Sequence, residues 1–359
     1  MKRSLRLLSP SGCSYVVFHR HGHRAPARDI LRDNEEWETR LPTRAAMDDT
    51  NKRIQITNHN PTDIEPPRDA ASHPFGALTE RGRSHLVEVG RRTRDAFPAM
   101  LQTQSINAYS TNYLRTQLSG QSFLLGLLEG SSPSSGPGVT LNYTVRKSAD
   151  CPMAFFDAHP KAELLLRSVR ESEEFQRIEG DAETVRLKEL LLRHLPLLRK
   201  ADGVSVDWPA AFDYVKCRPA HGLPLHPEIE CCKEHVVSHV TSRYGLYYRN
   251  KALLGHSAGP LISDALAKLQ GSSSTTTVFS GHDVTLLALL HSLDACVLAD
   301  DPTYWPDFGC TLVFEHCRGG GVAAFLDDAP LLMRVDGRDV HTRTVAQLGA
   351  LADALLAHS

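Results

Sequence analysis

Short runs of apolar and β-branched residues alternate with segments of helical periodicity at the two ends of the chain. Four runs, bounded by polar or glycine residues, have the length and composition of buried strands: residues 15–19, 105–110, 275–280 and 310–315. Apolar residues at helical spacing predict four helices: residues 79–97, 113–129, 284–293 and 344–358. Strands that alternate with helices indicate an α/β fold with a doubly wound, mostly parallel sheet.

The middle of the chain has a different pattern. Residues 131–138 (SSPSSGPG) have the composition of a linker, and residues 154–246 are helical by periodicity, with little sign of strands. We therefore expect an α/β core built from residues 1–138 and 247–359. A mainly helical insertion, or cap, is expected over residues 139–246.

The composition is that of a folded globular protein and indicates no large charged partner. The chain has 359 residues, of which 41% are hydrophobic and 23% charged, with 40 Lys and Arg against 42 Asp and Glu. A balance this close to neutral does not favour a nucleic acid or a membrane surface, so we expect neither as a partner. No run approaches 18 consecutive apolar residues, so no transmembrane segment is expected.

The start of the chain and its cysteines favour an intracellular protein. Arg6 and Pro10 interrupt the first apolar residues before a signal-like run forms, so we expect no signal peptide, while an organellar presequence stays open. The eight cysteines are even in number, but free thiols are the default in a long chain without a secretion signal. The expected location is the cytoplasm.

The first predicted strand runs directly into RHGHRAP at residues 20–26. Arg20 and Arg24 flank His21 there. Guanidinium groups donate paired hydrogen bonds to phosphoryl oxygens and an imidazole can act as a nucleophile, so the segment holds the groups that an anion-transfer site needs. The alternative is an exposed basic turn at the end of the strand. The presence of Arg20, His21, Gly22 and Arg24 within five residues favours a site instead.

A second strand end carries ionisable groups as well. The strand at 275–280 leads into Gly-His-Asp, which ends in His282 and Asp283. Ligands of an open α/β sheet bind outside the carboxyl ends of its strands, so these two residues converge on His21 if the two strands are neighbours. The alternative is that Asp283 caps the next helix and His282 is an ordinary turn residue.

Arg115 lies one turn into the helix that follows the strand at 105–110. A helix start together with an arginine suits a phosphate by both dipole and charge. Alone this signal is weak, because arginine is common in the first turn of surface helices.

Together these segments resemble the histidine acid phosphatases, the larger-insert branch of the histidine phosphatase superfamily. RHGHRAP fits R-H-G-x-R-x-P, and STNYLRT (residues 110–116) and the downstream GHD follow in the order of that family. Gly76-Ala77-Leu78-Thr79 with Gly82 is similar to G-x-L-T-x-x-G. The sequence STNYLRT is most similar to that of the lysophosphatidic acid phosphatase subgroup. The resemblance covers both α/β ends, and it implies a phosphoglycerate mutase-like sheet.

The resemblance implies a metal-independent phosphomonoesterase that needs no cofactor. His21 would be the nucleophile that forms a phosphohistidine, and Asp283 would protonate the leaving alcohol. The phosphoryl oxygens would be bound by Arg20, Arg24, Arg115 and His282, the last of which also counts among the catalytic residues. Such a set supplies the positioning and charge stabilisation that phosphoryl transfer needs. Because His21 must be neutral and Asp283 protonated, we expect an acidic pH optimum.

The leaving group is less defined than the chemistry. Loops above the strand ends vary while the reacting groups stay in place, so the polar segment at 28–75 and the insertion are expected to shape its pocket. The expected substrate is a small phosphomonoester, with a lysophospholipid, a sugar phosphate and an inositol phosphate all open.

Two other functions compete with this interpretation. Residues 255–259 (GHSAG) fit the G-x-S-x-G elbow of a serine esterase, with Ser257 as nucleophile. An elbow needs a buried strand directly before it, but only residues 252–254 are apolar there, and Pro260 opens a helix. A catalytically inactive phosphate-binding relative is the other alternative, against which stands the presence of every expected catalytic residue.

Two patterns of possible metal ligands are present, although we expect no metal at the site. An H-x-H at a strand end can hold a metal, but packing roles for the outer two residues fit the alternation of His19, His21 and His23 equally well. Cys231, His235 and His239 share one face of a predicted helix, with Cys232 adjacent. Two explanations are open: a structural zinc site, or a half-buried row of side chains that faces the helical core.

Overall fold

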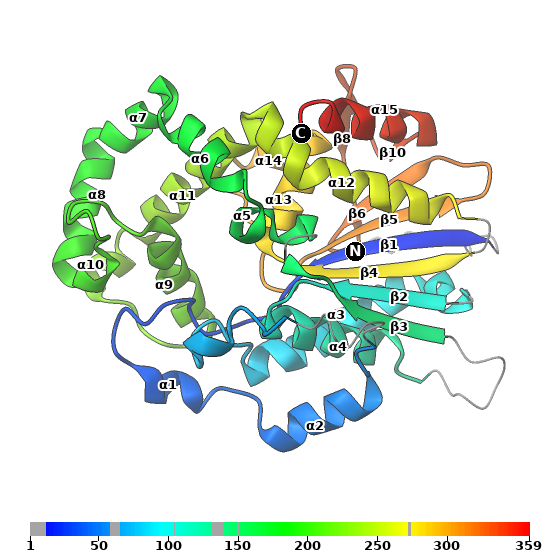
Figure 1. Ribbon diagram of the computed structural model, residues 1–359, viewed down its shortest axis with the longest axis horizontal. Helices are drawn as coiled ribbons and strands as arrows, with labels where there is room; N and C mark the ends of the chain where they lie inside the picture. The colour runs from blue at the N-terminus through cyan, green and yellow to red at the C-terminus, as the bar shows by residue number, and fades with distance from the viewer. Residues whose placement is uncertain (1–11, 58–64, 104, 131–139, 149–150, 272–273) are drawn as a thin grey trace, which may run out of the picture.

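The computed structural model describes residues 12–57, 65–103, 105–130, 140–148, 151–271 and 274–359. Its centre is an eight-stranded sheet in the order β10-β6-β5-β1-β4-β2-β3, with β7 paired to β6 (Figure 1). The strands of this sheet are β1 (Cys13–Arg20), β2 (Ser105–Ser110), β3 (Thr140–Val145), β4 (Thr275–Gly281), β5 (Thr311–Cys317), β6 (Val322–Leu326), β7 (Ala329–Pro330) and β10 (Thr342–Arg343). A separate hairpin consists of β8 (Met333–Val335) and β9 (Arg338–Val340).

The predicted α/β fold with a mostly parallel, doubly wound sheet is confirmed. β1, β4, β2 and β3 run parallel to one another, whereas β5 and β6 continue the sheet in antiparallel pairing beyond β1. The four predicted strands are all present. The predicted linker at 131–138 lies outside the described residues.

Helices cover both faces of the sheet because successive residues of its central strand point to opposite sides. Tyr15 and Val17 of β1 pack in one apolar cluster with residues of α3 (Glu80–Ala96) and α4 (Leu114–Leu127). Val16 and Phe18 pack in another cluster on the opposite face, with residues of α12 (Lys251–Leu269), α13 (Asp283–Ser292) and α15 (Val345–Leu356). Figure 1 shows these two helical layers on either side of the strands.

The helical middle of the chain is confirmed, and its helices gather at one end of the sheet (Figure 1). They are α5 (Phe155–Ala158), α6 (Ala162–Arg170), α7 (Glu173–Gly180), α8 (Ala182–His194), α9 (Trp208–Ala220), α10 (Pro227–Glu230) and α11 (Lys233–Arg249). β3 falls inside the range expected for the insertion, yet it pairs with β2 as a strand of the sheet. We therefore propose that the insertion starts after β3.

Two short helices lie in the segment that the sequence predicts to be a polar loop. They are α1 (Asn34–Glu38) and α2 (Arg44–Arg53), and a further short helix, α14 (Val297–Asp300), precedes β5. Thr43 caps α2 by accepting a hydrogen bond from the amide of Ala46 at 3.2 Å. α1 and α2 contain few apolar residues and α14 has only four residues, so periodicity does not reveal these helices. No helix among the described residues is long and apolar enough to span a membrane.

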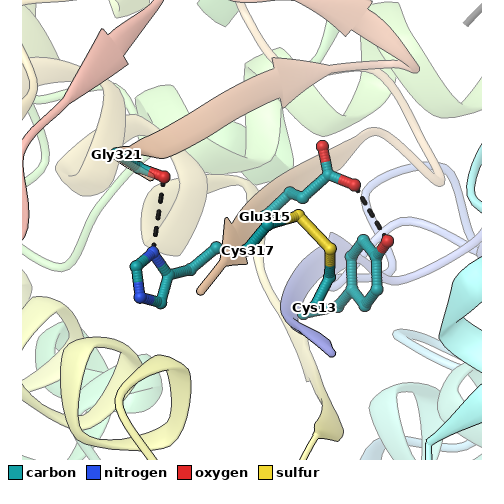
Figure 2. Close-up of a disulfide and its surroundings, with 6 residues drawn as sticks. Cys13, Glu315, Cys317 and Gly321 are labelled. Carbon is teal, nitrogen blue, oxygen red and sulfur yellow. Dashed lines mark hydrogen bonds between the residues drawn. A yellow bond between two sulfur atoms is a disulfide. The ribbon is translucent and has the colours of Figure 1, made fainter. Parts of the chain in front are cut away.

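The expectation of free thiols is wrong for two cysteines. Cys13 and Cys317 form a disulfide across the antiparallel pair β1–β5, where they lie directly opposite each other with their Cα atoms 4.1 Å apart (Figure 2). Directly opposite residues of antiparallel strands are close enough for such a bond. The two residues are 304 positions apart in the chain, so only the strand pairing reveals their contact. Within the described ranges, Cys217, Cys231, Cys232, Cys296 and Cys310 form no disulfide.

Candidate active site

The RHGHR segment and the GHD segment meet because β1 and β4 are parallel neighbours. Arg20 and Gly281 are register partners, and the amide of His21 donates to the carbonyl of Gly281 at 3.0 Å. The imidazole rings of His21 and His282 lie 5.7 Å apart between centroids. The condition set by the sequence, that the two strands be neighbours, is therefore met.

The imidazole of His21 is buried and held in one orientation. Its Nδ1 lies 2.9 Å from the carbonyl oxygen of Gly22, an acceptor, so in the neutral ring Nδ1 carries the proton and Nε2 keeps its lone pair. Burial, together with the charges of Arg115, Arg24 and Arg20, holds the pKa of His21 well below its usual range. The ring therefore stays neutral in acidic solution.

The guanidinium of Arg20 is fixed by three contacts within the site. One terminal nitrogen (Nη1) donates to the carbonyl of Pro306 at 2.7 Å, the other (Nη2) pairs with Oδ2 of Asp283 at 2.7 Å, and the guanidinium lies 4.1 Å above the ring of Phe308. Its Nε is buried and has no hydrogen-bond partner within the described ranges. A buried donor of this kind is costly unless a ligand accepts its hydrogen bond.

Arg24 is held in a similar way by a residue from the helical middle of the chain. Its two terminal nitrogens donate to the two carboxylate oxygens of Asp213, each at 2.8 Å, and Nη1 also donates to the carbonyl of Ala25. Its Nε is again buried without a hydrogen-bond partner in the described part of the chain.

Arg115 stands at the first turn of α4, as the sequence predicts. Asp69 accepts hydrogen bonds from the amides of Leu114 and Arg115 at 2.7 and 3.3 Å, and it pairs with the guanidinium of Arg115 at 3.3 Å. The same guanidinium lies 4.1 Å above the ring of Tyr113. Asp69 thus caps the helix and fixes its arginine at once.

His282 and Asp283 complete the site. Nε2 of His282 lies 3.1 Å from the hydroxyl of Thr111, and burial and Arg115 hold its pKa well below the usual range. Oδ2 of Asp283 accepts from Arg20 and, at 3.0 Å, from the indole of Trp305. Burial opposes ionisation of Asp283, but the two arginines Arg20 and Arg24 and the Trp305 donor outweigh it, so the pKa is lowered.

All six residues selected from the sequence therefore lie in one site. The residues that hold them were not predicted: Asp69, Thr111, Asp213, Trp305, Pro306 and Phe308. One signal for them was present, since residues 305–309 (WPDFG) combine an indole, a proline and a glycine between a helix and a strand. Asp69 stands in a polar segment and carries no such signal, whereas Asp213 lies in the mostly apolar run WPAAFDYVKC at residues 208–217.

The G-x-L-T-x-x-G segment packs against the backbone of the RHGHR segment and forms hydrogen bonds with it. The amide and hydroxyl of Thr79 both donate to the carbonyl of His23, at 3.0 and 3.1 Å. Gly82 lies so close to this backbone that a Cβ at its position would come within 2.1 Å of the carbonyl oxygen of His23. Glycine is therefore required here by close approach, not by its backbone angles.

We expect Gly82→Ala to lower the free energy of unfolding by about 2 kcal/mol, because α3 and the RHGHR backbone must move apart. Thermal or urea denaturation measures the change. Gly245→Ala is the matched control, since a Cβ at this helical glycine meets nothing within 4 Å and alanine favours the helix. Equal stability of the two variants would contradict the close contact.

The serine esterase alternative is not favoured. Ser257 is buried in the middle of α12, and its hydroxyl donates to the carbonyl of Leu253 at 2.9 Å, one helical turn earlier. In the described chain no strand leads directly into Ser257, because residues 251–269 are continuously helical. Ser257 thus lacks the exposed strand-to-helix turn of a nucleophile elbow.

The possible metal ligands have other contacts. His19 stacks on Phe123 with 4.9 Å between centroids, burial lowers its pKa to about 4, and His23 packs against Phe308 at 4.8 Å. In the helical middle of the chain, His235 pairs with Glu183 and His239 with Glu179. Across the described ranges, one group of three potential ligands lies close together, Cys13, Glu315 and Cys317, and its two sulfurs are joined in the disulfide (Figure 2).

Comparisons with known proteins give the family of this chain. The family model described as "Histidine phosphatase superfamily (branch 2)" matches residues 14–321. No curated protein matches the sequence significantly.

Several solved structures share the fold. A phytase from Citrobacter braakii is 15% identical with a TM-score of 0.58, over 96% of this chain and 98% of that one. A multiple inositol polyphosphate phosphatase from Bifidobacterium longum, in complex with inositol hexasulfate, is 14% identical with a TM-score of 0.60, over 96% and 93% of the two chains. A phytase from Klebsiella sp. ASR1 is 16% identical with a TM-score of 0.52, over 97% and 96%. With the match to the family model over most of its length, the chain belongs to branch 2 of the histidine phosphatase superfamily, the histidine acid phosphatases.

Proposed function

We propose that this chain hydrolyses small phosphomonoesters through a covalent phosphohistidine at His21, without a metal or another cofactor. The observation that carries the proposal is the pair of buried Nε donors on Arg20 and Arg24, which have no partner among the described residues and flank a neutral imidazole. Donors left without partners at the end of a strand are suited to the oxygens of a phosphoryl group.

The first half of the reaction transfers the phosphoryl group to the enzyme. Nε2 of His21 attacks phosphorus and forms the P–N bond, while the P–O bond to the leaving alcohol breaks. Asp283, in its protonated form, gives its proton to the departing oxygen. The arginines and His282 hold the remaining phosphoryl oxygens throughout, so charge is stabilised by groups already in place.

The second half returns the enzyme to its starting state. A water molecule attacks phosphorus and the P–N bond breaks, which restores neutral His21. The Asp283 carboxylate accepts the proton of that water and is again ready to act as an acid. Inorganic phosphate then leaves the site.

Protonation of Asp283 depends on the substrate. Two arginines and Trp305 favour its carboxylate form in the empty site. A bound phosphate ester competes for Arg20 and places negative charge beside the carboxyl group, and both effects raise the pKa of Asp283. The substrate thereby helps to create the acid that it needs.

We expect the maximum of kcat to lie below about pH 7. Attack requires neutral His21, and its lowered pKa keeps that form present well into the acidic range. Protonated Asp283 is lost as the pH rises through the pKa of its carboxyl group, so kcat falls toward alkaline pH. The measurement is kcat for p-nitrophenyl phosphate from pH 3 to 9, and a maximum on the alkaline side would contradict the assigned acid.

The function itself is tested by hydrolysis of p-nitrophenyl phosphate in EDTA and with vanadate. Activity that survives EDTA and falls with vanadate supports a phosphoryl-transfer site without a metal. Loss of activity in EDTA alone would favour a metal at the H-x-H segment, and no activity on any phosphate ester would favour the inactive relative.

The leaving-group pocket is proposed to involve the segment at 28–75. A mostly apolar cavity of about 310 Å³ is lined by Arg115 and by residues of this segment and of α4, among them Leu41, Met47, Leu114 and Leu118. An apolar wall suits a lipid leaving group, whereas the structural neighbours named phytase and inositol polyphosphate phosphatase favour an inositol phosphate. Comparison of kcat/KM for a lysophospholipid, a sugar phosphate and an inositol phosphate distinguishes these classes. The predicted cytoplasmic location rests partly on free thiols, and the disulfide between Cys13 and Cys317 counts against it, because disulfides are rare in the cytosol.

A further inference from the structure

Arg24 is the one site arginine in the described chain whose carboxylate partner comes from the helical middle. Asp213, on α9, receives both terminal nitrogens of Arg24 at 2.8 Å and also accepts from the amide of Ala27 at 2.8 Å. Asp213 is only 9% exposed and Arg24 7%. A buried, bidentate pair of this kind fixes both the position and the plane of the guanidinium.

The rest of α9 is bound to the same stretch of chain. Asp207, at its start, pairs with Arg28, and Arg218, near its end, pairs with Asp33. His221, directly after the helix, lies 2.9 Å from the hydroxyl of Thr79, which holds the backbone of the RHGHR segment. α9 therefore has a defined position relative to Arg24, and Asp213 transmits that position to the guanidinium.

The donors that Asp213 leaves available lie on one edge of Arg24. The inner N–H groups of Nη1 and Nη2 are used by the carboxylate, and the outer N–H of Nη1 by the carbonyl of Ala25. Nε–H and the second N–H of Nη2 remain, and they form the side edge of the fork, which binds two oxygens of a tetrahedral anion in parallel. The buried Nε without a protein partner belongs to this edge.

We propose that Asp213 is a positioning residue: it holds the guanidinium of Arg24 so that its side edge faces the phosphoryl group. This inference rests on the proposed function, because it takes Arg24 to be a phosphoryl ligand. It also gives α9 a part in the reaction, since a helix from the middle of the chain sets the orientation of a group in the phosphate site.

A different role for Asp213 leads to the opposite result. If the carboxylate only neutralised the charge of Arg24, its removal would make the site more positive and strengthen the binding of phosphate. If it positions Arg24, its removal lets the side edge turn away, so that phosphate binds more weakly and the transition state is less well stabilised. Inhibition by inorganic phosphate therefore separates the two roles.

The test is Asp213→Asn, assayed with p-nitrophenyl phosphate and with inorganic phosphate as competitive inhibitor. Asparagine keeps the size of the side chain but cannot accept both hydrogen bonds. We expect kcat/KM to fall about 100-fold, since a misplacement of about 1 Å in a reacting group costs that much. The inhibition constant of phosphate should rise at least about tenfold. Unchanged kinetics, or tighter phosphate inhibition, would overturn the inference.

Asp181→Asn is the matched control in the helical middle of the chain, because Asp181 caps α8 through the amides of Glu183 and Thr184, and asparagine still caps a helix. Its kinetics should stay within about twofold of wild type. If Asp213→Asn does not fold, Asp213→Glu keeps the charge while displacing the guanidinium, and it should show the same weakening of phosphate inhibition. A folded Asp213→Glu with wild-type kinetics would overturn the inference.

A double-mutant cycle shows whether Asp213 acts through Arg24. In the Arg24→Gln background, Asp213→Asn should change kcat/KM by no more than about twofold, because the group that it positions is already absent. A further 100-fold loss in that background would mean that Asp213 acts elsewhere and would overturn the inference. Failure of the proposed function is distinguishable, because the wild type would then be inactive, or His21→Ala would keep its activity, whatever the Asp213 variants show.

Discussion

His21→Ala is expected to lose at least about 1,000-fold in kcat on p-nitrophenyl phosphate and to form no phosphoenzyme. In the proposed mechanism the substitution removes the atom to which the phosphoryl group is transferred, and losses of this size follow the removal of a covalent nucleophile. Among the described residues, the ring donates its hydrogen bond to Gly22 and none to another site residue, so the arginines should keep their positions. Steady-state assay and acid-quenched labelling with a ³²P-labelled substrate measure both effects.

The control is His235→Ala, which removes a half-exposed histidine of α11 that pairs with Glu183. It should retain wild-type kcat. More than about a tenth of the wild-type turnover in His21→Ala, measured on protein that still melts cooperatively, would show that another group is the nucleophile.

Asp283→Asn is expected to produce a loss that depends on the leaving group. Alkyl phosphates need protonation of a strongly basic departing oxygen, so they should lose about 1,000-fold, whereas p-nitrophenyl phosphate should lose about 10-fold or less. Asparagine still accepts the amide of Val284 as Asp283 does, which keeps the start of α13 intact. The measurement is kcat/KM over a series of esters ordered by the pKa of the leaving alcohol.

The quantity to compare is the slope of log kcat/KM against the pKa of the leaving alcohol. A smaller fraction of folded enzyme lowers all values equally, so it leaves this slope unchanged. The variant should show a steeper dependence on the leaving-group pKa than the wild type. Parallel lines for the two proteins would remove Asp283 as the acid and leave it the role of fixing Arg20, with which it pairs at 2.7 Å.

The place where the candidate residues meet could be predicted from the sequence because His21 and Asp283 closely follow strands. His21 comes one position after β1 and Asp283 begins the helix after β4, so the strand pattern and the motifs give the same location. The parallel pairing of these two strands then brings the residues together. Arg115 was harder to select, since an arginine in the first turn of a helix is common.

The partners of the site residues could not be predicted, because they depend on contacts between distant parts of the chain. Asp213 lies 189 residues from Arg24, and Trp305 lies 22 residues from Asp283. A lone aspartate in a helix has the same local pattern whether it faces solvent or a buried guanidinium. Only the packing of the helical middle against the end of the sheet distinguishes the two cases.

The sequence pattern also did not predict the existence of β3 or the direction of β5. β3 is half exposed along most of its length, so its residues do not form the apolar run that marks β1 or β4. β5 has that run, but its antiparallel direction depends on how the chain returns to the edge of β1. The disulfide between Cys13 and Cys317 follows from that direction, and hence was missed with it.

This disulfide closes the chain into a covalent ring that contains nearly the whole protein, from the start of β1 to the end of β5. A single cut by a protease anywhere within the ring opens it but releases no fragment, because the disulfide still joins the two pieces. Nicked protein should therefore migrate as one species on a denaturing gel without reductant and as two with it. His21, directly after β1, and Asp283 remain parts of one molecule even after the backbone between them is broken.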